Sequence, residues 1–250
     1  MVRGAGTALN VATVLVGSGL GVALRGRLPD RTRTTVTDAL GLVTLVIGGL
    51  NVAAGLGDLD YTRAVSPGGT LLVVLGALLV GGIVGSLLGV EDRLEQVGAG
   101  LQRQLTGRSG DGRARFVEGF VSASLLFCVG PLTVLGSLSD GLGRGIDQLA
   151  LKSTLDGFAA VAFAASLGWG VAASALSVLV VQGSLTVLGI LLGSLLPAAL
   201  VAAVTATGGV LLLGVGLRLL AIKAVPVGDL LPALLVAPLL TAFVDLLRAG

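Results

Sequence analysis

Five polar side chains could do chemistry in this 250-residue sequence, because they lie within or beside long apolar segments. Asp140, Lys152 and Asp156 are ionisable, and Asn10 and Gln182 are amides. A carboxylate inside a membrane can bind a cation or a proton, and a nearby ammonium group can neutralise it when the site is empty. Buried amides must find hydrogen-bond partners. The five residues therefore predict a binding site for an ion or a small solute.

The spacing of Lys152 and Asp156 has two readings. At positions i and i+4 the two side chains can form an ion pair on one helix. Alternatively, Ser153 and Asp156 fit a capping box, which would only mark the start of a helix. The sequence leaves both readings open.

A helix break is predicted at Gly130-Pro131. Proline removes one backbone hydrogen bond of a helix, and the preceding glycine lowers the cost of bending. Within a membrane the freed carbonyl groups must face protein or a wet cavity. The break could therefore create a polar pocket, although proline kinks also occur in membrane helices that bind nothing.

Several kinds of site are absent from the composition. The chain has no His and a single Cys, Cys128, which excludes histidine-based catalysis, histidine ligation and cysteine clusters. No nucleotide-binding motif is present. We therefore expect no catalytic residue, no metal site and no cofactor. A Ser-Lys dyad of Ser139 and Lys152, in an intramembrane enzyme, is the remote alternative.

The overall composition is that of a polytopic membrane protein, whose first partner is the lipid bilayer. Apolar residues make up 54% of the chain and charged residues only 12%, whereas soluble domains carry about 25% charged residues. The net charge of +2 is too small for binding a nucleic acid. These values exclude a soluble enzyme, a disordered tail and a nucleic-acid-binding protein.

The apolar segments predict an all-α transmembrane bundle of about eight spans, each near the 20 residues that a spanning helix needs. Only Gly168-Trp169-Gly170 separates the fifth span from the sixth, so these two form either a tight hairpin or one bent helix, and seven spans is the alternative. The expected spans are 4–24, 36–56, 69–90, 117–139, 152–170, 171–195, 198–219 and 229–247.

An internal repeat is indicated at an offset of 168 residues. Leu28-Pro29 then aligns with Leu196-Pro197, and Gly41, Leu45 and Gly48 align with Gly209, Leu213 and Gly216. Spans one to three would correspond to spans six to eight, in opposite orientation, as in the inverted repeats of secondary transporters. The alternative is that both copies are merely rich in Leu and Gly, and with seven spans the inversion could fail.

The repeat divides a single membrane domain, residues 1–250, into four parts. We expect repeat copy one at 4–90, an amphipathic surface helix and loop at 91–116, a central broken-helix pair at 117–170, and repeat copy two at 171–250. Arginine is concentrated in loops 25–35 and 91–116, so the positive-inside rule places both loops in the cytoplasm and the N-terminus outside.

Two central runs, FCVGP and KSTLDG, together with the pattern of the whole chain, resemble the YqgA/YdfK-like bacterial membrane proteins, catalogued as domain of unknown function 554. The resemblance implies a multi-pass protein of the bacterial plasma (inner) membrane with no established activity, in some cases labelled a transporter. It supplies no catalytic residues. This chain differs at Val181, where family members tend to have Tyr, and at Ser86, where many have Glu.

We therefore expect a small secondary transporter or channel-like permease for an ion or small solute. Its site would lie between the repeat copies and the central broken helices. The alternative is a non-transporting membrane scaffold or regulator, which would bind partners through helix 91–106 or through Gly-rich faces. Those faces would also suit a homo-oligomer.

Overall fold

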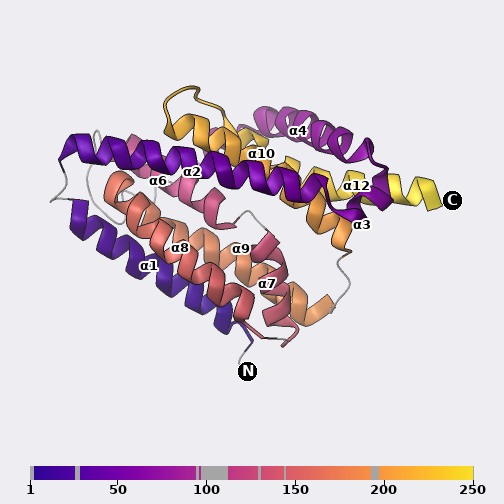
Figure 1. Ribbon diagram of the computed structural model, residues 1–250, viewed down its shortest axis with the longest axis horizontal. Helices are drawn as coiled ribbons and strands as arrows, with labels where there is room; N and C mark the ends of the chain where they lie inside the picture. The colour runs from indigo at the N-terminus through magenta and orange to yellow at the C-terminus, as the bar shows by residue number, and fades with distance from the viewer. Residues whose placement is uncertain are drawn as a thin grey trace. The chain divides into compact units, whose positions relative to one another are not determined.

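The computed structural model describes residues 3–25, 29–93, 96, 112–128, 131–143, 145–192 and 197–249. These residues form helices joined by short turns, and none of them lies in a β-strand (Figure 1). The predicted all-α polytopic bundle is confirmed. The chain divides into two compact units. The first unit comprises Met1–Leu40, Leu94–Cys128 and Leu132–Ser194, and the second comprises Gly41–Arg93, Val129–Pro131 and Leu195–Gly250.

The first unit is built around a close pair of parallel helices, α1 (Ala5–Arg25) and α8 (Asp147–Leu167), which run alongside each other in Figure 1. Gly17 and Gly21 of α1 lie on the backbone of α8. A Cβ atom at Gly17 would lie 2.4 Å from the carbonyl oxygen of Gly157, and one at Gly21 would lie 2.3 Å from that of Val161. Small residues four apart let membrane helices approach this closely.

A tight hairpin joins α8 to α9 (Gly170–Leu192). Gly168 makes the turn with a φ of 83°, a conformation that glycine adopts without strain. Thr7, near the start of α1, forms a hydrogen bond with Thr186, near the end of α9. Helix α9 is therefore antiparallel to α1, and the hairpin alternative for the fifth and sixth spans is correct.

The predicted helix break separates α6 (Gly112–Cys128) from α7 (Pro131–Gly141). Pro131 has no N–H group to donate to the carbonyl of Phe127, four residues earlier. The hydroxyl of Thr133 donates to that carbonyl instead, at 3.3 Å. A side chain thus satisfies the carbonyl that the break has freed. Gly130 itself lies outside the described residues.

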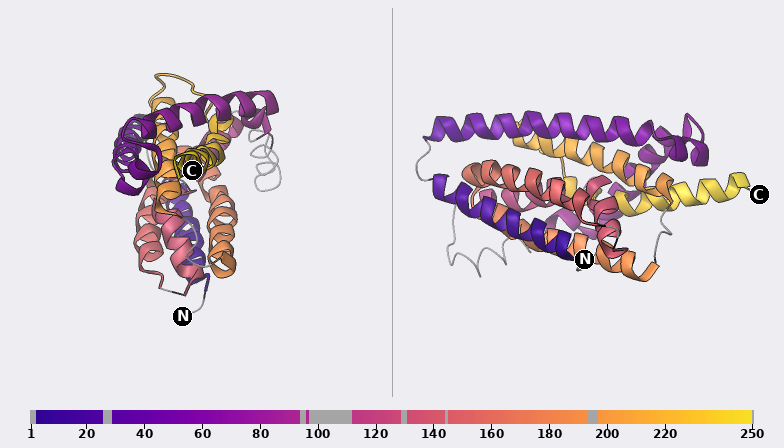
Figure 2. Two further views of the ribbon diagram at one scale, coloured as in Figure 1. Left: turned by 90° about the vertical axis from the view of Figure 1, so that its right-hand side faces the viewer. Right: turned by 60° about the horizontal axis from the view of Figure 1, so that its bottom comes forward.

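The second unit contains α3 (Leu59–Val65), α4 (Gly69–Leu88), α10 (Ala198–Leu219), α11 (Val227–Leu230), α12 (Ala233–Ala249) and most of α2 (Asp30–Leu56). Helices α2 and α10 pack antiparallel along glycines spaced seven residues apart, and they lie side by side in both figures (Figure 2). A Cβ at Gly48 would lie 2.8 Å from the oxygen of Gly209, and one at Gly216 would lie 3.0 Å from that of Gly41.

Helix α4 completes the second unit by packing antiparallel to the segment that holds α11 and α12. Gly85 lies on the backbone of Asp229, and Gly81 lies on that of Ala233. A cluster of buried apolar residues fills the space between α3, α4, α10 and α12: Tyr61, Ala64, Val65, Val73, Ala77, Ala199, Ala202, Ala203, Ala233 and Ala237.

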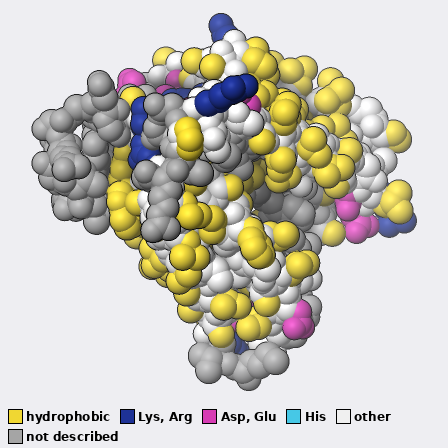
Figure 3. Space-filling model, turned by 60° about the vertical axis from the view of Figure 1, so that its left-hand side comes forward, with side chains coloured by type: hydrophobic (Ala, Val, Ile, Leu, Met, Phe, Trp, Pro, Cys, Tyr) yellow, Lys and Arg dark blue, Asp and Glu magenta, His cyan; other side chains and the backbone are white. Residues whose placement is uncertain are grey.

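Seven segments of the described chain are long and apolar enough to cross a membrane. They are Ala5–Arg25, Thr37–Leu56, Gly69–Leu88, Asp147–Leu167, Gly170–Leu191, Ala198–Leu219 and Val227–Arg248. The eighth expected span, 117–139, occurs instead as the two shorter helices α6 and α7. Hydrophobic side chains are spread over much of the face in Figure 3, and many large ones are exposed, among them Leu87, Leu191 and Phe158.

Other expectations about the chain's organisation remain untested. The order of two long helices, a short helix and a further helix occurs in α1–α4 and again in α9–α12. The first residues of α2 and α10, Asp30 and Ala198, are 168 residues apart. The inverted repeat itself stays a prediction. In the expected surface helix and loop 91–116, residues 94–95 and 97–111 lie outside the described residues.

Candidate ion or solute site

Helix α8 carries Lys152 and Asp156 on one face, one turn apart. The helix begins at Asp147, five residues earlier than expected, so both side chains lie inside it rather than at its end. The hydroxyl of Ser153 donates to the carbonyl oxygen of Leu149 at 2.6 Å, as serines within helices commonly do. The capping-box reading is therefore wrong, because Ser153 and Asp156 start no helix.

Lys152 and Asp156 form a buried ion pair between Nζ and Oδ2. Their side chains are only 8% and 10% exposed. The amide nitrogen Nδ2 of Asn10, from α1, donates to the same Oδ2 atom at 2.9 Å. Two helices thus supply donors to one buried carboxylate.

Two amides of the first unit are fully buried yet incompletely bonded. Asn10 and Gln182 are both 0% exposed. The Oδ1 atom of Asn10 and both polar atoms of Gln182 have no hydrogen-bond partner among the described residues. Since buried polar groups in native proteins are almost always paired, these atoms are candidates for contact with water or a ligand.

The contact between α1 and α9 places Asn10 and Gln182 at the same height along these two helices. The hydroxyls of Thr7 and Thr186 lie 3.2 Å apart and fix the register of these antiparallel helices. Asn10 follows Thr7 by three residues, and Gln182 precedes Thr186 by four, so both amides lie one turn further along the same interface. The structure thereby brings Gln182 to the level of Asn10 and its partner Asp156.

This level lies near the middle of α8 and α9. Asp156 lies nine residues after the start of α8, and Gln182 lies ten residues before the end of α9. At 1.5 Å per residue these positions are about 14–15 Å from the helix ends. The hydrocarbon core of a bilayer is about 30 Å thick, so α8 and α9, if they span it end to end, would carry both side chains near its midplane.

Asp140 is buried as well, but it has a different set of partners. Its carboxylate accepts hydrogen bonds from the backbone N–H groups of Gly4 and Gly6, each at 3.0 Å. Gly4 directly precedes α1 and Gly6 lies in its first turn, where backbone amides have no partners within the helix. Asp140, on α7, therefore caps α1 from another helix, and this geometry favours a structural role.

Helix α6 ends at Cys128, directly before the break. On α7, the hydroxyl of Ser137 is buried without a partner among the described residues. Sequence reasoning did not single out Ser137, and the polar pocket expected at the break stays a prediction.

Sequence reasoning also missed Thr7 and Thr186, and a signal for both was available. Thr7 precedes Asn10 by three residues and Thr186 follows Gln182 by four, so each hydroxyl shares a helix face with an amide. A polar face of this kind within an apolar helix indicates a polar contact with another helix.

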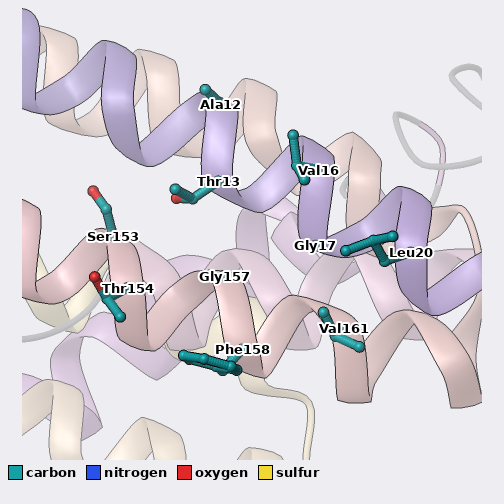
Figure 4. A pocket seen from close by; sticks show the side chains of 10 residues that line it. All are labelled: Ala12, Thr13, Val16, Gly17, Leu20, Ser153, Thr154, Gly157, Phe158 and Val161. Carbon is teal, nitrogen blue, oxygen red and sulfur yellow. The ribbon is translucent and has the colours of Figure 1, made fainter.

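An open groove of about 400 Å³ lies between α1 and α8, and it is distinct from the polar cluster (Figure 4). Its walls are mainly apolar, with Val16, Leu20, Phe158 and Val161 among them. The three hydroxyls that line it, those of Thr13, Ser153 and Thr154, each donate to a carbonyl of their own helix. The groove therefore offers no free polar group to a ligand.

Comparisons with known proteins agree with the predicted resemblance. The model of the family "Protein of unknown function (DUF554)" matches residues 5–242. The chain belongs to this family. It is 32% identical to the uncharacterized protein YqgA of Escherichia coli (strain K12) over 238 residues, which cover 95% of this chain and 96% of the relative.

A second relative in this family is the uncharacterized membrane protein YdfK of Bacillus subtilis (strain 168). It is 28% identical over 233 residues, which cover 93% of each chain. No solved structure matches the chain significantly. The family comparison, like the spans, indicates a multi-pass membrane protein.

Proposed function

We propose that this DUF554 protein is a small secondary transporter or channel-like permease for an ion or a small solute. Its binding site is the cluster of Asn10, Lys152, Asp156 and Gln182 in the first unit. The observation that carries the proposal is a buried ion pair within an apolar helix long enough to span a membrane, together with buried amide atoms that have no partner among the described residues.

Stability alone gives no reason to keep these residues. A buried ion pair is often no more stable than apolar side chains of similar volume, and a buried unpaired polar group costs about 1–3 kcal/mol. Leucine at positions 152, 156 and 182 would serve a structural bundle at least as well. Ionisable residues within a membrane accordingly tend to mark ion and substrate pathways.

The arrangement of the helices supports the same proposal. The pairs α1 with α9, α2 with α10, and α4 with α12 are each antiparallel, which is the relation that an inverted repeat requires. Each unit contains helices from both expected copies. Inverted repeats and discontinuous helices, such as α6 and α7, are common in secondary transporters.

We further propose the orientation and location predicted from the arginine distribution. The N-terminus lies outside the bacterial plasma membrane, and loops 25–35 and 91–116 lie in the cytoplasm. This orientation puts Asp140 and the start of α1 toward the outer face. Protease accessibility of epitope tags inserted in the two loops of right-side-out vesicles would test it.

The alternatives have less support. A scaffold that docks through helix 91–106 would use a segment that lies mostly outside the described residues. An enzyme with a Ser139-Lys152 dyad would need the lysine as a base, whereas the ammonium group of Lys152 is engaged by Asp156. We therefore propose a protein without catalytic activity.

A panel of flux measurements in proteoliposomes tests the proposal. Gradients of H⁺, Na⁺ and K⁺ would be followed with ion-sensitive dyes for the wild type, Asp156→Asn and Asp140→Asn. Asp245→Asn is the matched control, because Asp245 is exposed on α12. We expect Asp156→Asn to abolish a flux that Asp245→Asn retains. Flux that survives in folded Asp156→Asn would remove this cluster as the site.

A further inference from the structure

We propose that the cluster binds a monovalent alkali cation in exchange for a proton that Lys152 releases. The inference rests on the proposed function, because it names the substrate of the same site. It makes an additional claim, however, since it fixes the charge of the ligand and couples its binding to a proton.

The available ligand atoms are oxygens. Asn10 and Asp156 meet directly through a hydrogen bond and offer a carbonyl oxygen and a carboxylate, and the register of α9 on α1 adds the unpartnered carbonyl oxygen of Gln182 at the same level. The chain contains no His, so imidazole ligands of transition metals are absent. Carboxylate and carbonyl oxygens suit hard cations such as the alkali and alkaline-earth ions.

The charge of the site selects among these cations. Asp156 is the carboxylate within the cluster, because the carboxylate of Asp140 is held by the first backbone amides of α1. A divalent ion on one carboxylate would leave an uncompensated positive charge at mid-membrane depth, which is costly. A monovalent ion leaves the site neutral.

Lys152 already supplies that single positive charge when no metal ion is bound. If a cation M⁺ replaces the ammonium group at Asp156, the site would carry one excess charge unless Lys152 loses a proton. The balanced step is Lys152–NH₃⁺ plus M⁺ giving Lys152–NH₂, bound M⁺ and H⁺ in water. Lysine can deprotonate in this way when buried. The exchange is therefore one cation for one proton.

Few other groups could supply the released proton. Helix α6 contributes the thiol of Cys128 and, ten residues earlier, the partly buried Glu118, while α7 contributes Asp140 and α8 contributes the exposed Asp147 in its first turn. Helix α9 contains no ionisable residue, and on α1 the nearest is Arg25 at its far end. A Cys128→Ala variant separates the thiol from Lys152 as the source.

The test measures binding and proton release together on the detergent-solubilised full chain. NaCl, LiCl and KCl would be titrated calorimetrically at constant ionic strength, with N-methyl-D-glucamine chloride as the balancing salt. Titration in two buffers with different protonation enthalpies counts the protons released. We expect one proton for each bound cation in the wild type and in Cys128→Ala, and no binding in Asp156→Asn.

Two substitutions of Lys152 give opposite expected results. Lys152→Arg should abolish binding, because arginine keeps its charge at all accessible pH values. Lys152→Gln should still bind the cation, but the released proton then comes from Asp156, because without the ammonium group the empty site is neutral only when this carboxylate is protonated. Lys223, the other lysine of the chain, is exposed. Lys223→Arg and Lys223→Gln are therefore matched controls and should behave as the wild type.

Each outcome decides between the two proposals. Folded wild-type protein that binds none of the three cations overturns the inference, even if flux of another solute upholds transport. Binding without proton release in the wild type, or cation binding that persists in Lys152→Arg, overturns the exchange. Cation binding with proton release but no flux in proteoliposomes supports the inference and removes the transport function.

Discussion

The two units of the molecule bury different chemistry. The buried polar residues of the second unit, among those described, are all threonines: Thr44, Thr70, Thr205, Thr207 and Thr241. Of these, Thr205 and Thr241 donate to the carbonyl one turn earlier in their own helices. The first unit buries Asp140, Lys152 and Asp156 and also the amides of Asn10 and Gln182.

The two units also differ in the number of buried side-chain atoms that lack a hydrogen-bond partner. Four residues of the first unit, Asn10, Ser18, Ser137 and Gln182, have buried side-chain atoms without a partner among the described residues. In the second unit the corresponding residue is Thr207. The second unit is thus built for close backbone packing, whereas the first keeps polar groups available. Substitutions should therefore affect the first unit through charge and the second through size.

The largest effect is expected from Asp156→Ala in the first unit. Removing one partner of a buried pair leaves Lys152 uncompensated and should lower the unfolding free energy by about 3–5 kcal/mol. The double variant Lys152→Met with Asp156→Leu should recover most of this loss and still lack any cation binding. Reversible unfolding of the purified protein in mixed micelles measures the unfolding free energy of the single and the double variant. Equal stability of the single and double variants would contradict a charge effect.

In the second unit, a smaller loss of stability is expected when a substitution changes only the size of a side chain. Gly48→Ala puts a Cβ atom 2.8 Å from the oxygen of Gly209, and overpacking of this kind costs about 1–3 kcal/mol. The neighbouring Gly49 has nothing within 4 Å of its Cβ position, so Gly49→Ala should keep or slightly raise stability. The same unfolding assay compares them, and similar losses in both would contradict close packing of α2 on α10.

A partly exposed ion pair of the second unit should contribute less to the free energy of unfolding. Glu91 accepts from Arg218 at 2.6 Å and from the backbone N–H of Gly228 at 2.5 Å. Glu91→Gln should cost about 1 kcal/mol, and less at high salt, because surface pairs are screened. Asp60→Asn is the control, since Asp60 pairs with Arg63 where their side chains are 55% and 75% exposed. A salt-independent loss would point to packing instead.

The smallest effect on stability at neutral pH is expected from the ionisation of Tyr61. This residue of α3 is fully buried, and its hydroxyl donates to the carbonyl oxygen of Thr70 at 3.0 Å. Burial raises the pKa of this phenol from 10.0 to about 12. Between these values the unfolded chain loses a proton that the folded chain keeps, so stability should fall as pH rises from 10 to 12.

Tyr61 is the only tyrosine, so the ultraviolet absorbance of phenolate reports its ionisation alone. The folded protein should show this absorbance near pH 12, and the unfolded chain near pH 10. Tyr61→Phe is the control and should show no such change. Phenolate absorbance near pH 10 in the folded protein would contradict the burial of Tyr61.

The sequence was informative where apolar length and local chemistry decide the structure. Helix α10 has the predicted bounds 198–219, because Pro197 precedes it and charged or turn residues follow it. The break before Pro131 follows from the missing N–H group. The start of α8 was misplaced because the polar residues from Asp147 to Asp156 resemble a loop with a cap, whereas packing against α1 keeps them helical.

The geometry of the site depended on contacts that local pattern does not encode. Asn10, Lys152 and Asp156 were all named from the sequence, but the hydrogen bond from Asn10 to Asp156 requires the register of α1 on α8. The glycines at 17 and 21 set that register. Likewise, Asp140 was grouped with Lys152 and Asp156 because the three are near in sequence, whereas its hydrogen bonds go to the start of α1.

The partners of α1 have a consequence for biosynthesis. Gly6 is bonded to a residue 134 positions later, Asn10 to one 146 positions later, and Thr7 to one 179 positions later. A ribosome that synthesises the chain from its N-terminus delivers α1 to the membrane long before α7, α8 and α9 exist. The first helix must therefore wait in the lipid or beside an insertion factor with Asn10 unpaired. Stalled chains that end before Asp156 should be sensitive substrates for membrane quality control.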